Sequence, residues 1–265
     1  NARCPLSPEG KRGVAKQRMA VIAVYSLKGG VGKTTLAVNL AWSSAIQSSR
    51  RTLLWDLDPQ AGASFLLGHD GRNKGAAQAV FAKDVAPEKL VVPTGIDRLS
   101  LLAADTSLRS LDRLLFTLGK KKRLAKLIAG LEKEYDRVIL DCPPGLTETS
   151  EQVMRAADAI IVPLIPSPLS RRALEEVVQH LDREHKGHGP ILPVFSMVDR
   201  RRTLHRAALE AEPDWPVIPM ASAVEQMAVH RAPVGAFAGE SAAGQAFTAL
   251  WRGIEARLVR LSKTA

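Results

Sequence analysis

The sequence of 265 residues has little cysteine and no long apolar run. Its two cysteines, Cys4 and Cys142, have neither the spacing of metal ligands nor that of a disulfide framework, which favours a reducing compartment. No apolar run approaches the roughly 18 residues of a membrane span. Residues 1–18 are basic and rich in proline and glycine, without the apolar core of a signal peptide. We therefore expect a cytoplasmic protein with a disordered basic arm over residues 1–18 and one domain over residues 19–265.

Positive charge, by contrast, is abundant. Lysine and arginine total 37 against 27 aspartates and glutamates, which gives a formal net charge of +10. Such an excess favours a polyanionic partner, either nucleic acid or an anionic membrane surface. With 46% hydrophobic and 24% charged residues, the chain has enough apolar side chains for the core of one large domain.

Short apolar runs alternate with helix-like segments along the chain. The runs are apolar at consecutive positions, as expected of strands buried on both faces: 20–26, 51–56, 98–104, 137–141, 159–164, 191–198 and 216–219. The helix-like segments lie between them: 34–48, 122–134, 150–157, 169–184, 202–211, 221–230 and 242–261. The alternation predicts an α/β fold, a single-domain, doubly wound, mostly parallel sheet flanked by helices.

A glycine-rich stretch, "SLKGGVGKTT", separates the first predicted strand from the first predicted helix. Its end, Gly32-Lys33-Thr34, matches the end of the phosphate-loop pattern G-x-x-x-x-G-K-[ST], although Leu27 stands where that pattern begins with glycine. Glycines let backbone N–H groups approach phosphates, and the helix directs its positive end at them. The pattern predicts that Lys33 bridges the β- and γ-phosphates and that the Thr34 hydroxyl ligates Mg²⁺. The alternative is a glycine-rich turn with incidental lysines.

Two further stretches place aspartates at the ends of predicted strands. "LLWDLDPQAG" carries Asp56 and Asp58, and "YDRVILDCPPG" carries Asp141 followed by two prolines and Gly145. Ligands of open α/β sheets bind at this edge of the strands. Taken alone, the first stretch is equally well explained as a strand end capped by an Asp-Pro turn.

"KGGVGKTT" resembles the deviant Walker A motif of the ParA/MinD family, in which the position of Leu27 is not held to glycine and a second lysine, here Lys28, is the signature. The resemblance covers nearly all of residues 19–262. It implies a P-loop ATPase whose homodimer encloses two ATP molecules, with Lys28 of each subunit reaching the phosphates bound by the other. A lysine supplied in this way makes dimerisation depend on ATP, because two facing triphosphates need additional positive charge.

The resemblance also implies roles for individual residues, with ATP and Mg²⁺ as cofactors. Asp58 positions the attacking water and acts with Lys28 and Lys33 in hydrolysis, which is slow and stimulated by a partner protein. The Mg²⁺ shell would comprise Thr34, Asp56 and Asp141. The expected ATP-binding residues are those of the loop and two near the adenine: Lys28, Gly29, Gly30, Val31, Gly32, Lys33, Thr34, Thr35, Asp199 and Pro219.

Many relatives of this type bind DNA nonspecifically as the ATP dimer, through basic residues of later helices. The predicted DNA-binding residues are the arginines of "VDRRRTLHR" and one farther along: Arg200, Arg201, Arg202, Arg206 and Arg231. At 218–223 the chain reads "IPMASA" where chromosomal members commonly carry "IPRNVR". The DNA contact that those members make through this segment is therefore not carried over, and Arg231 is out of register with it. The alternative for the arginine cluster is a solvated loop. "KKKR" at 120–123 is interpreted as solvated surface.

We expect a switch ATPase that positions or partitions DNA or a large cargo, associates with the nucleoid and has a ParB-like or other activating partner. A MinD-like membrane regulator is one alternative, because "ALWRGIEARLVRLSKTA" is amphipathic and basic, but the segment coincides with the family's final core helix. A metabolic P-loop synthase is another, although no motif for a substrate carboxylate stands out. An iron–sulfur carrier would need suitably placed cysteines, which Cys4 and Cys142 do not provide.

Overall fold

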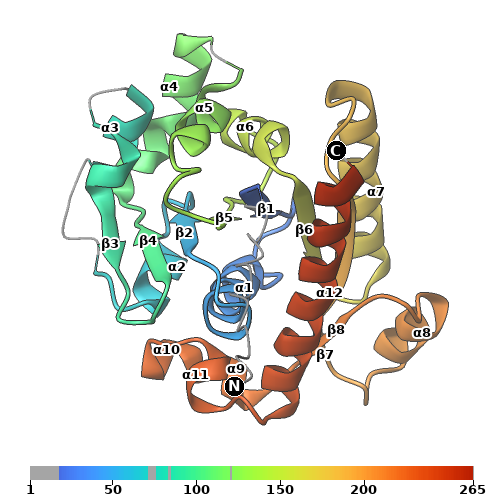
Figure 1. Cartoon of the computed structure of the whole chain (residues 1–265). Coiled ribbons are helices and arrows are strands. Elements are labelled where there is room, and N and C mark those ends of the chain that lie inside the picture. The colour runs from blue at the N-terminus through green and yellow to red at the C-terminus, as the bar shows by residue number, and fades with distance from the viewer. Residues whose placement is uncertain (1–17, 71–75, 83–84, 120, 265) are drawn as a thin grey trace, which may run out of the picture.

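The computed structural model describes residues 18–70, 76–82, 85–119 and 121–264. Most of the expected basic arm, residues 1–17, therefore lies outside the described residues, as do Lys120 and Ala265. Within the described ranges the strands form one sheet of eight, in the order β3-β4-β2-β5-β1-β6-β7-β8 (Figure 1). They are β1 (Ala20–Val24), β2 (Thr52–Asp56), β3 (Val91–Pro93), β4 (Leu99–Leu102), β5 (Arg137–Asp141), β6 (Ala159–Leu164), β7 (Ile191–Val198) and β8 (Val217–Pro219).

All neighbouring strands of the sheet are parallel except β3, which pairs with β4 in the antiparallel direction at one edge. In the register of the sheet, Asp141 at the end of β5 is the partner of both Val24 in β1 and Asp56 in β2. Because the strands are parallel, their carboxyl ends meet at one edge, which is where open α/β sheets bind ligands.

Helices cover both faces of the sheet. One face is covered by α1 (Lys33–Gln47), α2 (Gly62–Leu66), α9 (Ser222–Glu225), α10 (Met227–His230), α11 (Val234–Phe237) and α12 (Ala242–Thr264). The other is covered by α3 (Ala76–Ala82), α4 (Leu111–Leu118), α5 (Arg123–Gly130), α6 (Glu148–Ala156), α7 (Pro168–Glu184) and α8 (Thr203–Ala211), with short 3₁₀ turns at Pro87–Leu90 and Thr106–Ser110. Figure 1 shows the two layers on opposite sides of the central strands.

The central strand shows why the sequence folds in this way. Val21 and Ala23 of β1 face one core, whereas Ile22 and Val24 face the other, and all four are buried. Successive side chains of a strand point to opposite faces, so a strand with helices on both sides must be apolar at every position. The run at 20–26 therefore predicted a central strand correctly.

The predicted α/β class, the mostly parallel sheet and the single domain are confirmed. Some details of the prediction were wrong. The segment 221–230 forms two short helices, α9 and α10, rather than one. The edge strand β3 and the helices α2, α3, α4 and α11 were not predicted.

The last helix, α12, packs its apolar residues into the core. Leu250, Trp251, Ile254 and Leu258 are all buried against the face that also carries α1. They are the residues that suggested a membrane-surface helix, and the fold already uses them. None of the helices within the described ranges is both long and apolar enough to span a membrane.

Candidate nucleotide site

The glycine loop joins β1 to α1 at the carboxyl edge of the sheet. Gly30 and Gly32 have φ angles of +70° and +89°, a left-handed conformation that glycine adopts without strain. Gly32 is the residue that caps α1, so the N-terminus of a helix of 15 residues opens directly onto the loop. The carbonyl of buried Val31 accepts a hydrogen bond of 2.7 Å from the Ser196 hydroxyl, which ties the loop to β7. The loop thus has a fixed shape that a phosphate group can use.

Lys33, the first residue of α1, is buried, with 7% of its surface exposed. Its ammonium donates a hydrogen bond of 3.0 Å to the carbonyl of Lys28. Burial lowers the pKa of Lys33, and the negative charges of Asp141 and Asp58 oppose that change. The cation is therefore held over the loop, next to two carboxylates, where a phosphate would compensate its burial.

Lys28 occupies a different place in the same loop. It is half-buried, and its backbone N–H donates a hydrogen bond of 3.3 Å to the Ser26 hydroxyl. It lies beside the end of β6 and the start of α7, where it borders a small cavity with Leu164 and Ser170. The two lysines thus lie in different surroundings, one over the loop and one toward β6 and α7.

Asp141 is completely buried, and no hydrogen bond within the described residues reaches either of its carboxylate oxygens. Burial raises its pKa well above the usual value, and the charge of Asp56 raises it further; the nearby Thr34 hydroxyl and Lys33 ammonium act in the opposite direction. A buried carboxylate without a partner is costly. Asp141 therefore fits the role of a group that receives a cation, directly or through its water, next to the Thr34 hydroxyl.

Asp56 is buried too, but both of its oxygens accept hydrogen bonds. One accepts a hydrogen bond from the backbone of Asp58 at 3.1 Å, and the other accepts two from Ser64, at 2.9 Å and 2.7 Å. Burial raises the pKa of Asp56 to about 6. These contacts hold α2 in place, which indicates an indirect role for Asp56, and its place in the Mg²⁺ shell stays a prediction. No pattern in the sequence pointed to Ser64.

Asp58 lies between these buried groups and the surface. It is half-buried, and one of its oxygens accepts a hydrogen bond of 2.9 Å from the backbone of Gln60. The loop that follows it is packed closely against the nucleotide loop: a methyl group added at Gly62 would come within 3.1 Å of the Thr34 side chain. Asp58, Thr34 and Lys33 are therefore brought together, as the motifs predicted.

Beside the glycine loop is a mostly apolar cavity with a volume of about 100 Å³. It is bordered by Gly32 and Thr35 on one side and by Met197, Pro219 and Phe247 on the other. Met197 has a φ angle of +53°, and its methyl group points toward Gly32. The structure thus brings Pro219 next to the loop, as predicted for a residue near a base. No pattern in the sequence pointed to Met197.

Asp199 does not border this cavity. Its carboxylate accepts hydrogen bonds from the Arg201 side chain, both at 2.9 Å, and from the Arg201 backbone at 3.0 Å. The Arg201 guanidinium holds the pKa of Asp199 at about 2. Asp199 shapes the turn before α8 instead, and its predicted contact with adenine finds no support in the geometry.

Four of the five predicted DNA-binding arginines form one exposed group around the start of α8, which we call the α8 arginine group: Arg200, Arg201, Arg202 and Arg206. Arg206 donates hydrogen bonds to the carbonyls of Arg200 and Arg201, at 3.1 Å and 3.0 Å, and so fixes the turn. Buried His205 accepts a hydrogen bond of 3.0 Å from the Asp199 backbone. The group follows β7 and so lies at the same edge of the sheet as the glycine loop.

Arg231 is separate from that group. It ends α10, its guanidinium stacks 4.5 Å from the centre of the Phe65 ring, and it forms an ion pair with Asp70. Figure 1 shows α10 and α8 at different ends of the molecule. The structure therefore does not bring Arg231 together with the other predicted DNA-binding residues, because its side chain is used to connect α10 to α2.

Comparison with known proteins agrees with this site. The chain matches the family described as an AAA domain over residues 19–192. It is 32% identical over 196 residues to the chromosome partitioning protein ParA of Myxococcus xanthus, over 72% of this chain and 69% of that protein. The chain belongs to the ParA/MinD family of P-loop ATPases. The glycine loop with its two lysines, Lys28 and Lys33, is the family's deviant Walker A motif in this chain.

Two solved structures show how widely the fold of the ParA/MinD family is shared. A cobyrinic acid a,c-diamide synthase from Mycobacterium smegmatis with bound ATP analogue and magnesium is 28% identical and has a TM-score of 0.75, over 89% of this chain and 94% of that one. The septum site-determining protein MinD of Pyrococcus horikoshii, complexed with Mg-ADP, has the same fold at 24% identity, with a TM-score of 0.76 over 92% and 98% of the two chains. The fold alone therefore does not distinguish a synthase from a positioning protein.

Proposed function

We propose that the protein is an ATP-dependent dimerising switch that positions or partitions DNA or another large cargo, with residues 19–265 as the ATPase domain and residues 1–18 as a basic arm. Sequence identity with a chromosome partitioning protein supports this over the synthase. The observation that carries the proposal is the placement of the two lysines. Lys33 is buried over the loop beside Asp58 and Asp141, whereas Lys28 lies toward β6 and α7. Lys33 would bind the phosphates of the subunit's own nucleotide, and Lys28 would be available to the nucleotide of a partner subunit.

In the proposed ATP complex, the loop amides from Gly29 to Thr35 hold the phosphates, and Lys33 moves from the Lys28 carbonyl to the β- and γ-phosphates. Mg²⁺ would offset charge on these phosphates. The Thr34 hydroxyl and Asp141 would hold it, because Asp141 has two buried oxygens without hydrogen-bond partners among the described residues. The apolar side chains of Met197, Pro219 and Phe247 would contact the base.

Hydrolysis is the slow step of the proposed cycle. Asp58 would orient the attacking water, since its carboxylate lies near Lys33 and is only half-buried. The chain supplies no evident arginine finger besides Lys28 from the partner subunit, and such a cation contributes much of the rate in related phosphoryl transfers. An activating partner of the ParB type would therefore be needed to end the ATP state by ordering the loop of Asp58.

The α8 arginine group is the proposed surface for DNA in the cytoplasm, and it would place the ATP dimer on the nucleoid. Its guanidinium groups are exposed, and within the described part of the chain Arg201 is the one member that forms an ion pair with a carboxylate, that of Asp199. Contacts of this kind with phosphates are independent of sequence and sensitive to salt. Dimerisation would place two such groups on one particle, which makes DNA binding depend on ATP.

DNA retention of the wild-type protein and of the variant Arg200→Ala/Arg201→Ala/Arg202→Ala tests this surface, in ATP and in ADP, at about 50 and about 200 mM salt. We expect tight binding only with ATP, and a loss of at least about tenfold in the variant, with a salt slope shallower by about 0.9 for each phosphate contact removed.

The matched control is Lys121→Ala/Lys122→Ala/Lys126→Ala, which removes the same charge from the exposed start of α5. Equal losses in the two triple variants would show that net charge, and not the α8 arginine group, retains DNA. No loss in the arginine variant would mean that the group is a solvated turn.

A further inference from the structure

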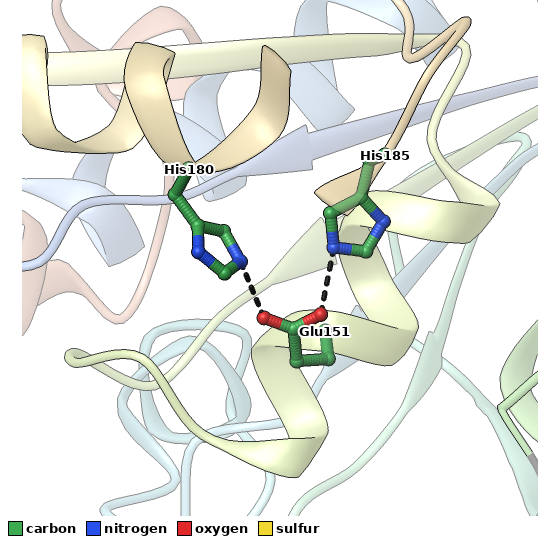
Figure 2. Close-up of side chains that lie close together, drawn as sticks. All are labelled: Glu151, His180 and His185. Atoms are coloured by element: carbon green, nitrogen blue, oxygen red, sulfur yellow. Dashed lines mark hydrogen bonds and ion pairs between the residues drawn. The ribbon is translucent and has the colours of Figure 1, made fainter. Parts of the chain in front are cut away.

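A second cluster of chemically active side chains lies outside the nucleotide site. Glu151 of α6 is placed between His180 of α7 and His185, the residue that ends α7 (Figure 2). The Nε2 atom of His180 lies 2.5 Å from one oxygen of Glu151, and the Nε2 atom of His185 lies 2.7 Å from the other. Potential ligand atoms of the three residues all lie within 4.8 Å of one another. Side chains from two helices thus converge on one point.

The cluster is shielded from solvent. The side chains of His185, His180 and Glu151 are 3%, 13% and 24% exposed. Burial lowers the pKa of His185, and its hydrogen bond to Glu151 only partly offsets that change.

Hydrogen bonds within the cluster do not satisfy all of its atoms. The Nδ1 atom of His185 is buried and has no hydrogen-bond partner among the described residues. Buried polar atoms without partners are rare, and an ion or a water absent from the coordinates is a common reason. The His185 imidazole therefore has a polar atom that the described residues leave unused, in addition to the Nε2 atom that faces Glu151.

We propose that Glu151, His180 and His185 bind a divalent transition-metal ion of the zinc class and thereby connect α6 to the end of α7. Two imidazoles and one carboxylate suit zinc and its neighbours, whereas Mg²⁺ prefers oxygen ligands only. Three protein ligands leave one tetrahedral position for water or another small ligand. The donors of a tetrahedral zinc ion are about 3.4 Å apart, so each His–Glu contact must open by under about 1 Å, which side-chain rotation can supply.

One neighbouring charge opposes the ion and offers a means to test it. Arg155, one turn farther along α6, has its guanidinium 3.9 Å from the Glu151 oxygen that faces His185. Its side chain is 29% exposed, so it can turn outward when a cation binds. Replacing Arg155 with a neutral residue should strengthen metal binding. A cluster held only by hydrogen bonds would bind no metal ion and would show no such change in affinity.

The test is calorimetric titration of Zn²⁺ alone into the full chain, untagged and free of nucleotide, with Co²⁺ absorption as a second readout of tetrahedral ligands. We expect one equivalent with a Kd on the order of 1 µM or below. His180→Ala and Glu151→Gln should each weaken binding by more than about tenfold, since even residues that only orient a ligand are worth about 10–100-fold. Arg155→Gln should tighten it severalfold.

Two controls separate this site from other histidines and from the nucleotide site. His188→Ala removes a neighbouring imidazole that faces Asp182, and Asp141→Asn removes the carboxylate of the nucleotide site; neither should change the zinc affinity. Circular dichroism would show that each variant is folded, and ATP binding would confirm this for the variants outside the nucleotide site. Absence of a stoichiometric site, or equal affinity in His180→Ala, Glu151→Gln and the wild type, would overturn the proposal and leave the cluster as a bridging carboxylate between two helices.

Discussion

Two aspartates, two residues apart, have different surroundings in this structure. Asp56 is completely buried and accepts three hydrogen bonds, which hold Ser64 and the Asp58 backbone. Asp58 is half-buried, accepts one hydrogen bond from Gln60, and lies near enough to Lys33 to oppose the fall in the pKa of that lysine. The surroundings of Asp56 show a structural role, and those of Asp58 support its proposed role in hydrolysis.

Replacing Asp58 with alanine should therefore leave ATP binding and dimerisation intact and slow hydrolysis by at least about 100-fold, the usual contribution of a residue that handles the attacking water. ATPase rates measured beside dimer lifetimes check this. Asp56→Ala is the contrasting variant, and it should lower the melting temperature because it leaves Ser64 without its acceptor. A normal rate in Asp58→Ala would assign the water to another residue.

Several functional residues were beyond prediction from the sequence. The positions of Lys33, Thr34, Asp58 and Asp141 were predictable because each lies within two residues of the end of an apolar strand or the start of a helix, so local sequence fixes its place. Ser196 and Met197 reach the loop from β7, far along the chain, and no local pattern marks such a contact.

At the scale of elements, the amino ends of β2 and β5 are joined by an ion pair. Asp136, just before β5, accepts hydrogen bonds from the Arg51 backbone at 2.9 Å and from its guanidinium at 2.8 Å. The Arg51 guanidinium lowers the pKa of Asp136. A carboxyl whose pKa is lower in the folded state stabilises the fold above its unfolded pKa, about 3.9, and loses that contribution as the pH falls through the folded value.

Asp136→Asn should consequently lower the free energy of unfolding by about 1 kcal/mol at pH 7, since both side chains are partly exposed. The difference from the wild type should shrink below about pH 4. Denaturant unfolding over a pH series measures it. Asp97→Asn, in the exposed pair with Arg98, is the matched control and should change little. A loss that is the same at every pH would show that the charge of Asp136 is not its source.

Short elements explain part of what the prediction of the fold missed. β3 has three residues and lies at an edge, where one partner suffices and apolar periodicity is weak. The segment 221–230 reads as one helix, but α9 and α10 are separated at Gln226, and Arg231, with a φ angle of +49°, ends α10, where its side chain packs on Phe65. Contacts between distant segments decide such boundaries, so local propensity does not predict them.

For the whole molecule, parallel strand direction brings every predicted nucleotide motif to one edge of the sheet. The ends of β1, β2 and β5 supply the glycine loop and the aspartates, and the end of β7 supplies the α8 arginine group. A dimer that closes over ATP at this edge would join the two functions, nucleotide binding and DNA binding, on one side of the particle.

The central claim is that ATP forms this dimer through Lys28. Light scattering of the wild type with ADP and with a non-hydrolysable ATP analogue tests it most directly, beside Lys28→Ala and the surface control Lys121→Ala. We predict the monomer mass of 28.6 kDa with ADP and twice that mass with the analogue for the wild type and the control. Lys28→Ala should bind both nucleotides and remain a monomer. A normal dimer in Lys28→Ala, or a wild type that stays monomeric with the analogue, would contradict the account.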